Sequence, residues 1–224
     1  MGTATASERK RLGAWYTPTE LVALVVDGVL DGFAPADASI RVVDPACGDG
    51  RFLVAVGDRL AAAGIGVELF GCDVDPGAVE AARRRGIAAV EADALGHPWQ
   101  FESFDLVVGN PPFLSQMASA TTRGGAGRGG AGPYADAAVE FLALATELAR
   151  PDGGRIGLVL PQSILGARDA EPVRGLVEQR CRLIWSWWSP EQTHFDAGIN
   201  VCALGFERPG DGAPGTWTQV VTNR

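Results

Sequence analysis

The sequence predicts a single α/β domain built on a doubly wound sheet that is mostly parallel and has an antiparallel edge strand. Two features predict this fold class. Short apolar runs typical of strands alternate with longer stretches of helical apolar spacing, and such alternation gives a parallel sheet with helices on both faces. Several apolar runs also end in polar or glycine-rich turns, which is where open sheets of this kind bind ligands.

The individual elements follow from the turn residues that separate them. The first helix has Pro18 at its start, where the missing N–H has no helical partner to lose. A later helix ends before Pro151 and the glycines that follow it. The expected helices span residues 18–30, 51–63, 76–85, 135–150 and 171–180. The expected strands span residues 40–44, 67–73, 87–91, 104–109, 155–160, 183–188 and 201–207, the last two forming an antiparallel edge pair.

One folded domain is expected from residue 13 to residue 210. We expect a flexible amino-terminal arm over residues 1–12 and a tail over residues 211–224. A chain of 224 residues, 46% of them apolar, is long enough to bury a substantial core.

Residues 114–133 interrupt the pattern of strands and helices. Six glycines and two arginines lie between Thr121 and Gly132, so this stretch has little apolar surface to bury. We expect a mobile loop. The alternative is a flap that grips the substrate, in which Arg123 and Arg128 contact phosphates.

A glycine turn follows the first predicted strand. Asp44-Pro45-Ala46-Cys47-Gly48-Asp49-Gly50 precedes a helix, so the backbone can pass close to a ligand while the new helix offers it free N–H groups. This is not the full dinucleotide fingerprint, because no third glycine follows in register. Asp73 ends the next strand, where a carboxylate can accept both hydroxyls of a ribose. Asp93 follows the third strand and could accept from the amino group of an adenine ring.

The tetrapeptide Asn110-Pro111-Pro112-Phe113 stands directly after the apolar run that ends at Gly109. Its simplest interpretation is an ordinary turn. The same residues also suit methylation of a weakly nucleophilic NH2 group, whose lone pair is delocalised. An Asn oxygen and a rigid carbonyl can accept both hydrogens and draw the nitrogen toward tetrahedral geometry. The prolines fix the backbone, and Phe113 offers a flat face for a ring.

These residues together resemble the S-adenosylmethionine-dependent N6-adenine DNA methyltransferases, over roughly residues 13–207. The resemblance implies a Rossmann-like methyltransferase fold, a restriction-modification or phage-defence context, and S-adenosyl-L-methionine as the cofactor. It implies catalysis by Asn110, Pro111, Pro112 and Phe113. It implies cofactor contacts from Tyr16, Thr17, Pro18, Asp44, Pro45, Ala46, Cys47, Gly48, Asp73, Val74, Asp93, Ala94 and Asn110. Phe113 and Phe195 would clamp a flipped base, with Arg123 and Arg128 also contacting the substrate.

The net charge of −8 argues against tight binding of duplex DNA by this chain alone, since phosphate contacts supply most non-specific affinity. Either a separate target-recognition domain or subunit supplies the DNA contacts, or the substrate is not duplex DNA. Two other functions therefore stay open. One is methylation of a glutamine amide in a protein, and the other is a cofactor-binding, non-catalytic subunit of a methyltransferase assembly.

The remaining signals concern the environment of the chain. Cys47, Cys72, Cys181 and Cys202 lack metal-binding spacing, so we expect reduced cysteines, no metal site and a cytoplasmic location. No apolar stretch is long enough to span a membrane.

The tryptophans at 185, 187 and 188 could stack on bases. Core packing is the simpler interpretation, because alternate positions of a strand face one side of a sheet.

Overall fold

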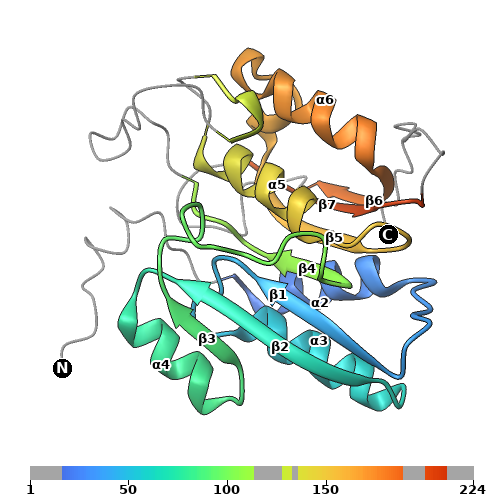
Figure 1. The fold of residues 1–224 in the computed structure, drawn as a ribbon. Coiled ribbons are helices and arrows are strands. Elements are labelled where there is room, and N and C mark those ends of the chain that lie inside the picture. The colour runs from blue at the N-terminus through green and yellow to red at the C-terminus, as the bar shows by residue number, and fades with distance from the viewer. Residues whose placement is uncertain (1–16, 114–127, 133–135, 189–199, 211–224) are drawn as a thin grey trace.

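A seven-stranded sheet with helices on both faces forms the framework of the protein (Figure 1). The computed structural model describes residues 17–113, 128–132, 136–188 and 200–210. The order of the strands in the sheet is β3-β2-β1-β4-β5-β7-β6. The strands are β1 (Ser39–Asp44), β2 (Gly66–Asp73), β3 (Ala88–Glu91), β4 (Leu106–Gly109), β5 (Arg155–Pro161), β6 (Arg182–Trp188) and β7 (Val201–Glu207).

The sheet is parallel from β3 to β5 and antiparallel beyond it. Strand β7 runs antiparallel to both of its neighbours, β5 and β6. The predicted fold class and the antiparallel pairing of the last two strands are therefore confirmed. The reversed strand lies between β5 and the edge strand β6.

Five α-helices cover the two faces of the sheet in the described part of the chain. Helices α2 (Thr19–Leu30), α3 (Arg51–Ala62) and α4 (Pro76–Arg84) cover one face, and α5 (Ala137–Leu148) and α6 (Glu171–Arg180) cover the other (Figure 1). Three short 3-10 helices, η1 (Arg128–Gly130), η2 (Gln162–Leu165) and η3 (Arg168–Ala170), complete the described structure. No described helix is long and apolar enough to cross a membrane.

Side chains close the ends of these helices. Asp75 caps α4 by accepting from the Gly77 N–H at 2.8 Å, and Asp136 caps α5 through the Ala138 N–H at 3.0 Å. Arg155, at the start of β5, donates to the carbonyls of Val29 and Asp31 at the end of α2. A cation at this position also suits the negative end of the helix dipole.

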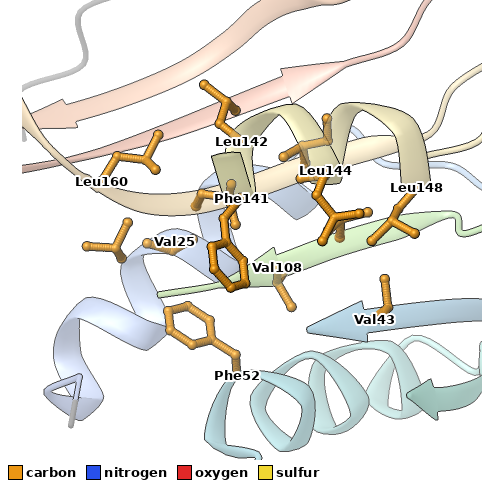
Figure 2. Close-up of a cluster of buried hydrophobic side chains, with 14 of the residues drawn as sticks. Val25, Val43, Phe52, Val108, Phe141, Leu142, Leu144, Leu148 and Leu160 are labelled. Atoms are coloured by element: carbon orange, nitrogen blue, oxygen red, sulfur yellow. The ribbon is translucent and has the colours of Figure 1, made fainter. Parts of the chain in front are cut away.

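Helix α5 is buried along most of its length where it packs on the centre of the sheet. Leu144 and Leu148 of α5 lie over β4 and β1, while Phe52 of α3 approaches from the other face (Figure 2). Val108 of β4 lies between these layers and is fully buried. Because strand β4 leads directly into Asn110, this packing fixes the position of the catalytic candidate.

Within the predicted mobile loop over 114–133, the structure describes residues 128–132. Residues 128–132 pack on the domain: Gly129 lies against Ala143 and Val173, Ala131 is buried, and the Gly132 N–H donates to the Asp169 carbonyl at 2.9 Å. The lack of side chains on the glycines allows this close approach to α5 and α6. Residues 114–127 lie outside the described residues, as do the predicted arm and the predicted tail.

The tryptophans of β6 mainly serve the packing of the fold. Trp185 lies against Gly28 of α2, where the helix has no side chain in the way, and Trp187 packs against the core. The interpretation of these residues as core packing is thus supported for Trp185 and Trp187.

Candidate active site

The predicted site residues gather at one edge of the sheet. Strands β3, β2, β1 and β4 are parallel neighbours, so their carboxyl ends meet there. Asp44 ends β1, Asp73 ends β2, and Asn110 follows β4. Doubly wound folds generally bind their ligands beyond the carboxyl ends of such strands.

Asn110 has one end of its side-chain amide fixed and the other end unpaired. Its Nδ2 donates to the Thr17 Oγ1 at 2.9 Å. Its Oδ1 is buried, and none of the described residues supplies it with a hydrogen bond. Leaving a buried acceptor unpaired costs roughly 1–3 kcal/mol, so such an atom in a native structure calls for an explanation. An N–H donor on a bound substrate would give the Asn110 Oδ1 the hydrogen bond that it lacks.

Gly109 permits the turn that presents Asn110. Its φ of +153° is one that residues with side chains rarely adopt, and a Cβ atom there would lie 2.5 Å from the Asp44 Oδ1. Asp44 itself is 1% exposed and accepts from the Ala46 N–H at 2.9 Å. Burial raises the pKa of Asp44 to about 8, with the Ala46 N–H opposing this shift and Asp73 adding to it.

The glycine turn is tied to the end of β2 by two hydrogen bonds. The Cys47 N–H donates to the Cys72 carbonyl at 2.9 Å, and the Gly48 N–H donates to the Asp73 Oδ2 at 2.8 Å. Gly48 has a φ of +53°, and the space beside its Cα is open. Pro45 is buried beneath the turn and Ala46 is half-buried. The turn is therefore rigid and has room for a ligand beside Gly48.

Asp73 is half-buried, whereas Asp93 is exposed. The Asp73 Oδ1 accepts from the Asp75 N–H at 2.9 Å, and burial raises the pKa of Asp73. The Asp93 Oδ1 accepts from the Leu95 N–H at 3.1 Å. Val74 is 55% exposed beside them, and Ala94 is buried.

The remaining predicted residues differ in their placement. Pro18 caps the start of α2, Pro111 is buried and Pro112 is half-buried. Phe113 is only 9% exposed, so less of its ring is accessible than the sequence suggested. Tyr16, Arg123 and Phe195 lie outside the described residues. Arg128 lies in η1, but its side chain is outside the described part of the chain.

Two residues were not singled out in the sequence. Gly109 could have been noticed, because a glycine directly precedes the Asn-Pro-Pro segment. Arg51 carried no signal beyond its place after the glycine turn, yet its Nη1 donates to the Thr17 carbonyl at 2.9 Å. Residues next to a motif can therefore belong to the site without matching the motif.

The four cysteines are free and buried. Burial raises the pKa of each thiol, so they are poor nucleophiles at neutral pH. Among the described residues, no group of three or more His, Cys, Asp or Glu side chains is placed to hold a metal ion.

Comparison with known families identifies the family of the chain. Residues 1–210 match the family model described as N-6 DNA Methylase. The chain belongs to the N-6 DNA methylase family. Over 123 residues it is 35% identical to the type I restriction enzyme MjaIX methylase subunit of Methanocaldococcus jannaschii, a match that covers 50% of this chain and 21% of that protein.

A second curated relative and a solved structure are also similar to this chain. Over 110 residues the chain is 40% identical to the type II methyltransferase M.TthHB8I of Thermus thermophilus, covering 49% of this chain and 23% of that protein. The crystal structure of a Listeria monocytogenes protein assigned to the class I S-adenosylmethionine-dependent methyltransferases matches with a TM-score of 0.70. That match has 18% identity and covers 94% of this chain and 65% of the other, so it shows the fold. The matched segments span only about a fifth of the two curated relatives.

Proposed function

We propose that this N-6 DNA methylase chain carries the catalytic site that transfers a methyl group from S-adenosyl-L-methionine to the N6 amine of an adenine in DNA. The observation that carries the proposal is the buried Oδ1 of Asn110, which receives no hydrogen bond from the described residues. An amine nitrogen brings the N–H donors that this acceptor lacks, and the membership of the family points to adenine in DNA.

The residues at the sheet edge fit the cofactor. The open space beside Gly48 leaves room for its methionine end, near Thr17 and the turn from Ala46 to Gly48. Asp73 would accept from the ribose hydroxyls and Asp93 from the adenine amine, with Val74 and Ala94 flanking the ring. When bound, the cofactor supplies an electrophilic methyl group.

The chain's own contribution is to prepare the target nitrogen. The Asn110 Oδ1 accepts one hydrogen of the amine and the Pro111 carbonyl accepts the other, which moves the lone pair out of the ring π system. Both acceptors are held in place before the substrate arrives, because the Thr17 hydroxyl fixes Asn110 and the proline ring fixes the backbone. Neither acceptor has to reorganise during the reaction.

The target base must leave the helix to reach this site. We propose that Phe113 and Phe195 clamp it, and that Arg123 and Arg128 contact the DNA backbone. A separate recognition domain or subunit would provide most of the affinity for DNA, since this chain has a net charge of −8. The relatives' names, a methylase subunit of a type I enzyme and a type II methyltransferase, support a restriction-modification setting.

The test measures methyl transfer from labelled cofactor to DNA, RNA and protein, with and without the products of neighbouring genes and at low salt. The Asn110→Ala variant should lose about 10² or more in turnover, the scale of one preorganised polar group. It should still bind the cofactor, which calorimetry would show. The control is Gln100→Ala, which removes an exposed amide outside the site. Wild-type turnover in Asn110→Ala would refute the proposal, and label found only in protein would favour the glutamine reaction.

A further inference from the structure

Arg51 links the glycine turn to the start of the described chain. It is the first residue of α3, and its Nη1 donates to the Thr17 carbonyl at 2.9 Å. Its Nε and Nη2 each reach one oxygen of Asp49 at 3.1 Å. Arg85, which directly follows α4, also forms an ion pair with Asp49, with its Nη2 3.3 Å from the Asp49 Oδ2. Two parallel contacts to one carboxylate fix the plane of the guanidinium group, so Arg51 presents Nη1 in a defined direction.

Thr17, which Arg51 holds by its carbonyl, is hydrogen-bonded to Asn110. The Thr17 side chain is 4% exposed, and its Oγ1 accepts from the Asn110 Nδ2 at 2.9 Å. A hydroxyl has one proton and two acceptor positions, so Thr17 keeps its proton for another acceptor. One residue therefore has its backbone held by Arg51 and its hydroxyl engaged with the catalytic amide.

The direction of the Asn110 amide decides whether the site can work. With Nδ2 on Thr17, the Oδ1 faces the position where no described residue supplies a donor. A reversed amide would present its NH2 group there. The Asn110 NH2 group and the target NH2 group would then face each other as two donors. Because the Thr17 hydroxyl can also donate, its hydrogen bond holds the amide in place, and the N–H donors of the target amine favour the orientation that turns the Oδ1 toward them.

We propose that Arg51 and Thr17 are positioning residues for methyl transfer. Arg51 holds the Thr17 backbone, and the Thr17 hydroxyl holds Asn110 with its Oδ1 toward the target amine. The catalytic consequence rests on the proposed function, whereas the orientation of the amide can be measured without any reaction. Asp49 fixes the Arg51 guanidinium group and thereby helps to hold both Arg51 and Thr17 in place.

The first measurement follows the side-chain NH2 signals of Asn110 in a ¹H–¹⁵N spectrum of the whole chain, assigned by their loss in Asn110→Ala. Thr17→Val replaces the hydroxyl by a methyl group of similar size and should shift these signals. Thr17→Ser keeps the hydroxyl and should leave them close to wild type. Arg51→Met should shift them as well. Arg59→Met is the control, because Arg59 lies on the same helix but makes an exposed ion pair with Asp27.

The second measurement is methyl transfer at saturating cofactor and DNA. Thr17→Val and Arg51→Met should each lower kcat by about tenfold with little change in KM for DNA, and Thr17→Ser should restore most of it. If Arg51 acts through Thr17, adding Arg51→Met to Thr17→Val should cause little further loss of kcat. A purely structural role would instead give additive losses and no recovery with serine.

The Asn110 spectrum tests the positioning of the amide, and methyl transfer tests its importance for catalysis. Unshifted Asn110 signals in both Thr17→Val and Arg51→Met would overturn the proposed positioning, whatever the activity. Full kcat in both variants would overturn its catalytic importance. A wild-type chain that methylates no DNA in any combination would overturn the proposed function, while the Asn110 signals would still decide whether Arg51 and Thr17 hold the amide.

Discussion

At the scale of single residues, Asp73 has a structural contact and a proposed ligand contact on the same carboxylate. Its Oδ2 holds the Gly48 N–H, and its Oδ1 holds the Asp75 N–H. Removing the side chain would therefore loosen the glycine turn as well as remove an acceptor for the ribose. Both effects act on the affinity for the cofactor in the same direction.

We expect Asp73→Ala to lower the affinity for S-adenosyl-L-methionine at least tenfold, since a charged acceptor contributes roughly 1.5–3 kcal/mol. Isothermal titration calorimetry measures this directly. Asp75→Ala is the matched control: it removes the α4 cap, which costs about 1 kcal/mol of stability, but no proposed cofactor contact. Equal cofactor affinity in Asp73→Ala and wild type would remove Asp73 from the cofactor site.

Asp44 gives the protein a pH-dependent stability. Its pKa of about 8 in the folded state lies above the ordinary value of 3.8, mainly because of burial. The folded state then binds a proton that the unfolded state has released, so the stability from this group is complete below pH 4 and is lost as the pH rises toward 8. The loss can reach about 1.4 kcal/mol per pH unit within that window.

Asp44→Asn removes this titration while keeping an oxygen that can accept from the Ala46 N–H. Relative to the wild type, the variant should gain unfolding free energy as the pH is raised from 5 to 8. Urea unfolding followed by circular dichroism at several pH values measures the difference. Parallel curves for the two proteins would mean that Asp44 does not titrate in this range.

At the scale of elements, the contact between α2 and β6 depends on a glycine. Replacing a glycine inside a helix by alanine normally stabilises by about 0.5–1 kcal/mol, because less backbone entropy is lost on folding. A Cβ atom at Gly28, however, would collide with the indole ring of Trp185. Overpacking of this kind typically costs 1–3 kcal/mol.

We therefore expect Gly28→Ala to destabilise the protein by about 1–2 kcal/mol, as measured by the midpoint of urea unfolding. Gly175→Ala in α6 is the matched control, since nothing lies within 4 Å of its added Cβ atom. That variant should be unchanged or slightly more stable. If both substitutions had the same effect, the packing of Trp185 on α2 would not limit this helix.

At the scale of the whole molecule, charge limits what this chain can bind alone. We expect its Kd for a short duplex at 150 mM salt to lie near 10⁻⁴ M, the weak end of non-specific binding. Fluorescence anisotropy against salt concentration measures both the affinity and its slope. Nanomolar binding at that salt concentration would show that the acidic surface hides a basic DNA-binding face, and the need for a recognition partner would then disappear.

The sequence by itself determined the fold class and the location of the candidate site. Local propensities and the spacing of apolar residues can be read from a single sequence. They predicted the alternation of strands and helices, the glycine turn before α3, and Asp73 at the end of β2. The Asn-Pro-Pro-Phe segment likewise lies at the end of a strand, as expected. The proposed cofactor residues at the ends of β1 and β2 lie at one sheet edge because parallel strands end together.

Only the tertiary structure decided how these residues are used. The Asn110 amide is hydrogen-bonded to Thr17, 93 positions away in the chain, and Arg51 donates to the Thr17 carbonyl from another element. Likewise, burial in the folded core raises the pKa of Asp44, and a Cβ atom at Gly28 would collide with Trp185. Such effects depend on distances between segments that are remote in sequence, and no local pattern of residues encodes those distances.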